Sequence, residues 1–268
     1  MPDQTLENKI LHEQADALKK EYAELFELKN HMLMYEEVML RSLYLISIGN
    51  DQYRLFRSEY DLAILKQKIL LAQVFFNRNE LPNWKEIESN IEKQFEDWQI
   101  KIANDAASIA NAKAYMKSGF LSDEDVEQLR TNYKRLVKRL HPDLHPNQTY
   151  KEKELFISVQ AAYNMCDLRM LNELISFLKG LKPQVSYVLP DLKSFVQKLT
   201  EMNAALQAKI NKLNKSFPFI YREKLQDKAW VESQQKKIEE QIIRVRKEIQ
   251  EKTQYLLLLQ SWKPQLLN

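Results

Sequence analysis

A histidine, a proline and an aspartate stand together at His141-Pro142-Asp143, directly after a predicted helix that ends at Leu140. Pro142 has a fixed φ angle and no amide donor, and it disfavours helical geometry at the residue before it. We therefore expect a stiff corner that holds His141 and Asp143 in fixed directions. A rigid, exposed carboxylate of this kind is suited to accept charge-assisted hydrogen bonds from an arginine of a partner protein.

The helix that leads into this corner is predicted to have one apolar face and one basic face. The apolar residues are Leu129, Tyr133, Leu136, Val137 and Leu140, and the basic residues are Arg130, Lys134, Arg135, Lys138 and Arg139. The apolar face would pack against the rest of the fold, and the basic face would attract an acidic partner. A basic face alone is often only a solvated surface, but next to the stiff corner it favours docking.

The segments on both sides of the tripeptide resemble the J-domain family. Tyr-Lys-Arg-Leu precedes it at 133–136, and the following helix repeats the family's Phe-x-x-Ile/Val-x-x-Ala-Tyr pattern. That pattern is formed by Phe156, Val159, Ala162 and Tyr163. The resemblance covers about 115–178. It departs from the family at Ser118 and Cys166, where leucine is usual, and at Asn132, where a small apolar residue is usual.

The resemblance implies an antiparallel helical hairpin that docks onto a DnaK-type chaperone and stimulates that partner's ATP hydrolysis. The implied docking face carries Arg130, Tyr133, Lys134, Arg135, Lys138 and Arg139, and stimulation would depend on His141, Pro142 and Asp143. The chain itself would hydrolyse nothing and need no cofactor. It has no Gly/Phe-rich segment and no zinc-binding cysteine repeats, which is typical of divergent J-proteins whose other regions bind a client or set the location.

Composition predicts an all-α protein. Three glycines and eight prolines among 268 residues, with 29% charged side chains, favour long helices over strands and turns. The 40 basic and 37 acidic side chains nearly balance, which does not indicate a nucleic-acid binder. One cysteine excludes an internal disulfide and a multi-cysteine zinc site. No signal-peptide pattern and no bilayer-length apolar run is present, so we expect a cytoplasmic protein without a membrane span.

The first predicted region, 1–114, consists of long amphipathic helices. Apolar residues recur every three or four positions over 6–48, then Gly49 and the polar residues after it predict a helix end and a new start. A second helix over 52–77 and a third over 83–117, opened by a capping box of Asn83 and Glu86, are expected to fold back antiparallel.

Two further regions follow, a J-domain-like hairpin over 115–180 and a helical hairpin or coiled coil over 190–268. Ser122 and Asp125 form a capping box that opens a helix to Leu140, and helices over 152–167 and up to 178 come after the tripeptide. A linker is predicted at 180–190. Helices over 192–214 and up to 260 carry a heptad seam, which does not decide whether it pairs within the chain or between chains.

Other interpretations of these residues remain open. His141, Asp143 and His145 have metal-ligand spacing, but without a fourth ligand we expect no metal. Methionines on the first helix could form a client surface, although they are more often core residues. The main alternative to a co-chaperone is a coiled-coil scaffold whose hairpin no longer couples to a chaperone ATPase. No catalytic constellation is visible, so we do not expect an enzyme.

Overall fold

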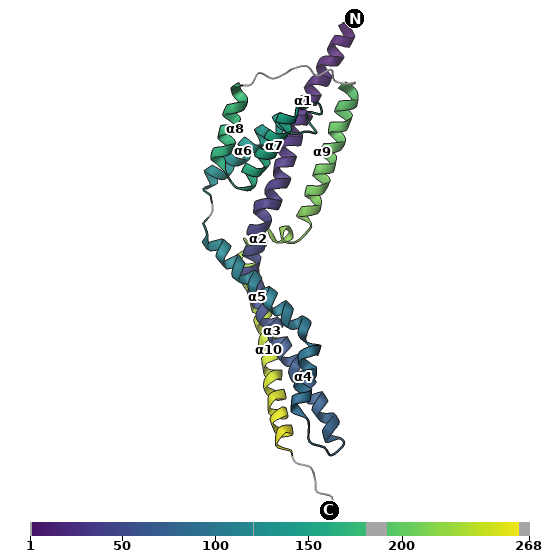
Figure 1. Cartoon of the computed structure of the whole chain (residues 1–268), viewed down its shortest axis with the longest axis vertical. Helices are drawn as coiled ribbons and strands as arrows, with labels where there is room; N and C mark the ends of the chain where they lie inside the picture. Colours follow the sequence, from purple (N-terminus) through teal and green to yellow (C-terminus); the bar gives the residue numbers. More distant parts are fainter. Residues whose placement is uncertain (1, 120, 181–191, 263–268) are drawn as a thin grey trace, which may run out of the picture. The chain divides into compact units, whose positions relative to one another are not determined.

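The computed structural model describes residues 2–119, 121–180 and 192–262, and these residues form helices with no strand among them (Figure 1). The all-α prediction is confirmed. The α-helices are α1 (Pro2–His31), α2 (Glu37–Tyr44), α3 (Asn50–Phe76), α4 (Trp84–Gln94), α5 (Glu96–Lys117), α6 (Asp123–Leu140), α7 (Tyr150–Asn164), α8 (Leu168–Gly180), α9 (Leu192–Asn214) and α10 (Lys228–Ser261). Two π-helical turns, η1 (Met32–Glu36) and η2 (Leu45–Gly49), and a 3-10 turn, η3 (Phe219–Tyr221), complete them.

The chain forms two compact units, and each unit combines two separate stretches of sequence. Unit 1 comprises Met1–Met39 with Gly119–Ile220, and unit 2 comprises Leu40–Ser118 with Tyr221–Asn268. The three consecutive regions expected from the sequence therefore do not coincide with the units. The predicted hairpin region falls in unit 1 from Gly119 onward, whereas the N-terminal and C-terminal regions are each shared between both units. The predicted linker lies almost wholly outside the described residues.

The helix break predicted at Gly49 is wrong. Gly49 has right-handed helical angles, φ −59° and ψ −33°, and α3 follows η2 directly. A Cβ at Gly49 would lie 3.0 Å from Leu45 Cδ2, so the glycine makes room for a side chain in the wide π turn instead of reversing the chain. The backbone therefore stays helical through Gly49, and the predicted helix end does not form there.

Unit 2 is built around the pairing of α3 with α10, with α4 and α5 packed on α3. Asn83 caps α4, and its side chain accepts a hydrogen bond from the amide of Glu86, as the sequence predicted. The predicted helix over 83–117 is interrupted at Phe95, whose φ of −107° is not helical. Phe95 instead joins a core beneath α3 that also contains Ala72, Ile87 and Ile91.

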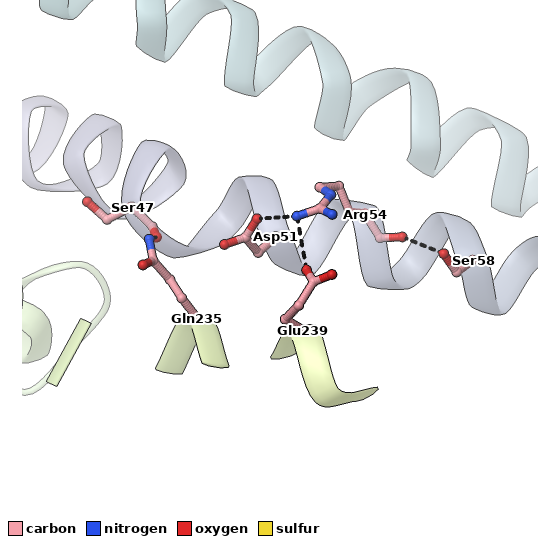
Figure 2. Close-up of polar contacts among 6 residues, drawn as sticks. All are labelled: Ser47, Asp51, Arg54, Ser58, Gln235 and Glu239. Atoms are coloured by element: carbon pink, nitrogen blue, oxygen red, sulfur yellow. Dashed lines mark hydrogen bonds and ion pairs between the residues drawn. The ribbon is translucent and has the colours of Figure 1, made fainter. Parts of the chain in front are cut away.

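Polar side chains also connect α10 to the start of α3 within unit 2 (Figure 2). The guanidinium of Arg54 donates to Asp51 at 3.0 Å and lies 3.2 Å from Glu239 of α10, and Gln235 of α10 donates to the carbonyl of Ser47 at 2.7 Å. Exposed ion pairs of this kind contribute little stability. The apolar seam of α10 must therefore provide most of the α3–α10 stability.

Unit 1 combines a pair of long helices, α1 and α9, with the shorter helices α6, α7 and α8. In Figure 1, α9 runs alongside α1, and α6 and α7 lie next to α1 on another side. The buried Asn203 of α9 donates to the carbonyl of Leu18 and to Glu21 of α1, which fixes the register of this pair. The predicted hairpin between the two C-terminal helices is not what forms: α9 pairs with α1, and α10 pairs with α3.

No helix within the described residues is both long enough and apolar enough to cross a bilayer.

Replacing the fully buried Ile242 of α10 with alanine should lower the free energy of unfolding of unit 2 by about 2–5 kcal/mol, because it removes buried methyl groups and leaves a cavity. The adjacent Ile243 is exposed, so Ile243→Ala should change it by about 0.5 kcal/mol or less. All four tryptophans, Trp84, Trp98, Trp230 and Trp262, lie in unit 2, so urea unfolding followed by tryptophan fluorescence reports this unit. Equal losses for the two variants would contradict the α10 packing.

Candidate functional site

The helix before the tripeptide begins and ends where the sequence predicted. The Ser122 hydroxyl accepts from the amide of Asp125 at 3.1 Å, so Ser122 caps the helix as expected. It also donates to the Asp125 carboxylate at 2.8 Å, whereas in a full capping box that carboxylate would accept from the Ser122 backbone amide. Acidic residues fill the first turn of α6, and Lys138 and Arg139 fill the last, so both ends complement the helix dipole. The helix stops at Leu140, because Pro142 forces His141 into an extended conformation with φ −69° and ψ 130°.

α6 and α7 form an antiparallel hairpin around the tripeptide loop. Tyr133 stacks on Tyr163 with ring centroids 3.8 Å apart, and His141, directly after the end of α6, contacts Phe156, which lies earlier on α7 than Tyr163. The predicted apolar faces of the two helices are buried together in one core that α8 extends. Its α6 and α7 members are Leu129, Tyr133, Leu136, Val137, Leu140, Phe156, Val159, Ala162 and Tyr163.

His141 is buried, with only 7% of its surface exposed, although the J-domain resemblance assigned it to the chaperone-binding loop. Its ring lies between Phe26 and Tyr22 of α1 and Phe156 of α7, with centroid separations of 4.5, 5.0 and 4.9 Å. Burial lowers the pKa of His141 to about 4, and this effect outweighs the nearby Asp143 carboxylate, which raises the pKa. The ring is therefore neutral at pH 7. The helix that covers this side of the loop, α1, was not anticipated from the sequence.

Hydrogen bonds fix the tautomer of this neutral imidazole. The backbone amide of Asp143 donates to His141 Nδ1 at 3.1 Å, so the ring proton is placed on Nε2, which lies 3.4 Å from the Tyr22 hydroxyl. That hydroxyl in turn donates to Asp143 Oδ2 at 2.8 Å. Because the imidazole is uncharged, its 3.9 Å separation from the Asp143 carboxylate is a contact within this network and not an ion pair.

Asp143 is therefore partly engaged within its own chain. Its side chain remains 55% exposed, but one carboxylate oxygen already accepts from Tyr22. Burial and the hydrogen bond to Asp143 both raise the pKa of Tyr22, which keeps its hydroxyl protonated as a donor. The sequence predicted an exposed Asp143 carboxylate that accepts hydrogen bonds from a partner. The structure instead shows a half-exposed carboxylate with one oxygen already bonded to Tyr22.

Two residues expected on the docking face are covered by α1. Tyr133 is buried, accepts a hydrogen bond from the Asn30 amide at 2.9 Å, and has its pKa raised to about 12 by burial. Arg130 forms a two-pronged ion pair with Glu27, with N–O distances of 2.7 and 3.1 Å, and this hydrogen bonding raises the arginine's pKa. The Tyr163 hydroxyl also donates to Glu27, which is only 1% exposed.

The other cations of the predicted docking face remain on the surface. Arg135, Lys138 and Arg139 are exposed and Lys134 is half-buried. Together these four residues form the basic strip, a name kept below for Lys134, Arg135, Lys138 and Arg139. The structure therefore divides the predicted site into an open basic strip and a covered group that consists of Arg130, Tyr133 and His141. Asp143 belongs to neither group, because its side chain is half-exposed.

The loop after the tripeptide is held by its own contacts. Leu144, only 1% exposed, lies in an apolar cluster with Ala15 and Tyr22 of α1 and Phe195 and Leu199 of α9. His145 Nε2 lies 2.8 Å from the carbonyl oxygen of Lys138. In the described part of the chain, no group of three His, Cys, Asp or Glu side chains has an arrangement that could hold a metal ion.

α1 is the functional element that sequence reasoning missed. Tyr22, Phe26 and Asn30 recur every four residues, and Glu27 lies beside them, so all four share one helical face. An apolar seam over 6–48 would bury Leu28, but Leu28 is exposed, and its polar neighbour Glu27 is buried. A buried glutamate carries no signal in a Glu-rich sequence, because only its distant partners Arg130 and Tyr163 make burial possible.

Comparison with protein-family models, with curated proteins and with solved structures found no match. The likeness to J-domains therefore rests on the sequence pattern alone.

Stability should fall on acidification in a manner that depends on His141. Its pKa is about 4 in the folded chain and near 6.5 when unfolded, so between pH 7 and 5 only the unfolded chain takes up this proton. The free energy of unfolding should fall by about 1–2 kcal/mol more for the wild type than for His141→Gln. Urea unfolding at both pH values measures this; the pKa values of His31 and His145 are also lowered, but both proteins retain these residues. Identical pH dependence would contradict the burial of His141.

Removing the Glu27 carboxylate should strongly destabilise unit 1. Glu27→Ala leaves the Arg130 guanidinium without its partner beneath α1, and we expect a loss of about 3–5 kcal/mol in the free energy of unfolding. Glu24→Ala is the matched control, because Glu24 lies on the same helix but in an exposed pair with Lys20, and should cost about 0.5 kcal/mol. Urea unfolding followed by far-ultraviolet circular dichroism compares them, and a similar loss in both would refute a buried role for Glu27.

Proposed function

We propose that this chain is a J-domain-like co-chaperone that docks on a DnaK-type chaperone and stimulates its ATP hydrolysis. The observation that carries the proposal is the α6–α7 hairpin, which meets at a proline-stiffened His141-Pro142-Asp143 corner. The neutral His141 ring accepts a hydrogen bond from the backbone amide of Asp143, and this bond fixes the direction in which the loop turns. ATP would be hydrolysed by the partner, and this chain would contribute binding groups only.

The charge on the hairpin supports the same function. The basic strip lies on the surface of α6 and leads toward the half-exposed carboxylate of Asp143. Such a strip accelerates encounter with an acidic surface, and the carboxylate offers an acceptor for an arginine once the two proteins meet. Unit 2 would then bind a client or assemble with other chains, for which α10 offers the exposed apolar residues Ile243, Leu257 and Leu258.

A second candidate function is a scaffold whose hairpin no longer couples to a chaperone. The observation that favours it is the cover of α1 over Arg130, Tyr133 and His141, which are residues that docking would use. In a scaffold these contacts would be purely structural, and the chain would leave the ATPase rate of a DnaK-type protein unchanged.

ATP turnover by a bacterial DnaK-type protein, measured at increasing concentrations of the full chain, separates the two. The wild type should raise the steady-state rate, and His141→Gln and Asp143→Asn should each raise the half-maximal concentration about tenfold or more. Asp143→Asn removes the charge of the loop's acceptor, and His141→Gln removes the ring that accepts from the Asp143 amide and positions the loop. His12→Gln is the matched control, since His12 is an exposed histidine of α1. If all four proteins leave the rate at its basal value, the scaffold is the better description.

A further inference from the structure

Three polar contacts join one face of α1 to the groups that docking would use. Tyr22 donates to Asp143 at 2.8 Å, Glu27 pairs with Arg130 at 2.7 Å, and Asn30 donates to Tyr133 at 2.9 Å. The three α1 residues are spaced so that they lie on one side of the helix. Each of them ends on a residue that the J-domain resemblance assigns to the chaperone-binding face.

We propose that α1 is an intramolecular lock that occupies the chaperone-docking face and must leave it before a DnaK-type partner can bind there. The inference rests on the proposed function, because it concerns the regulation of that same face. The α1 contacts resemble those expected from the partner. The Glu27 carboxylate pairs with Arg130 as an acidic residue of a chaperone surface would. Tyr22 gives Asp143 the donor that an arginine would supply.

The two binding modes exclude each other for chemical reasons. The Glu27 carboxylate accepts hydrogen bonds from both Nε and Nη2 of Arg130. A partner carboxylate would need these same two donors for a bidentate contact. Tyr133 and His141 lie beneath α1, where no second protein can reach them. Three of the four residues of the basic strip, Arg135, Lys138 and Arg139, stay exposed, so a partner could be attracted to the hairpin before α1 has moved.

The loop itself is part of the lock. Leu144 follows Asp143 directly and is buried in the seam between α1 and α9, against Tyr22 and Leu199. Release of the tripeptide therefore requires Leu144 to leave this seam. Leu144 is not one of the predicted docking residues, so its substitution tests the lock without removing a docking group.

The consequence for affinity is quantitative. If only a small fraction of molecules has α1 detached, the apparent dissociation constant is the intrinsic one divided by that fraction. Weakening the lock raises the open fraction and so lowers the partner concentration needed. Loss of one hydrogen bond to a charged group corresponds to about tenfold or more in such an equilibrium.

Tyr22→Phe and Leu144→Ala test the lock in the full chain. Tyr22→Phe removes only the hydroxyl that contacts Asp143, and Leu144→Ala weakens the anchor of the loop. In the ATPase titration with a DnaK-type protein, each should lower the half-maximal concentration about tenfold relative to the wild type. Adding Asp143→Asn to either variant should remove the gain. Tyr255→Phe is the matched control, since Tyr255 loses only a hydrogen bond from Gln73 in unit 2.

The outcomes distinguish the lock from the proposed function. A wild type that stimulates as well as both variants overturns the lock and leaves the co-chaperone function in place. A wild type and variants that are all inert overturn the co-chaperone function, and the lock with it. In the unmodified chain, a saturating DnaK-type protein should also accelerate amide hydrogen exchange over 15–30 of α1. Stimulation of the ATPase without that acceleration would overturn the lock even if the variants were unstable.

Discussion

The buried carboxylate of Glu27 is the constraint on which unit 1 depends. It accepts hydrogen bonds from Arg130 of α6 and Tyr163 of α7, and so it ties α1 to both helices of the hairpin. A glutamate at this depth is tolerated only when its charge is paired and its lone pairs are used. Because the pairing is directional, it also fixes the rotation of α1, which brings Tyr22 to Asp143 and Asn30 to Tyr133.

Local signals in the sequence predicted the elements near the tripeptide well. The Ser122 cap, the helix end at Leu140 and the apolar faces of α6 and α7 each depend on residues within a few positions of one another. The start and end of α9 likewise agree with the prediction, because its heptad pattern is continuous and a Ser-Phe-Pro break follows soon after its last residue. The hairpin at the centre of the candidate site could thus be predicted without a structure.

Long-range choices could not be predicted in the same way. A heptad seam specifies that a helix will pair, but it does not name the partner, and α10 pairs with α3 although α9 is nearer in sequence. The sequence Gly49-Asn50-Asp51 is typical of a helix end, but Gly49 lies in a π turn. There the small size of the glycine matters more than its flexibility. The cover over the candidate site is a long-range choice of the same kind, since it depends on the pairing of α1 with α6 and α9.

The chemistry of the α1–α6 contact is consistent with an interface that separates reversibly. A purely structural contact would gain as much or more from apolar residues at these positions, since replacing a buried ion pair by well-packed apolar side chains is often neutral or stabilising. Here Arg130, the Tyr133 hydroxyl and Asp143 face polar groups of α1, and each can be hydrated or rebound when α1 departs. The apolar faces of α6 and α7, by contrast, pack on each other and would stay covered. Polar groups are thus placed where a partner can replace them, and the apolar core where the hairpin must persist.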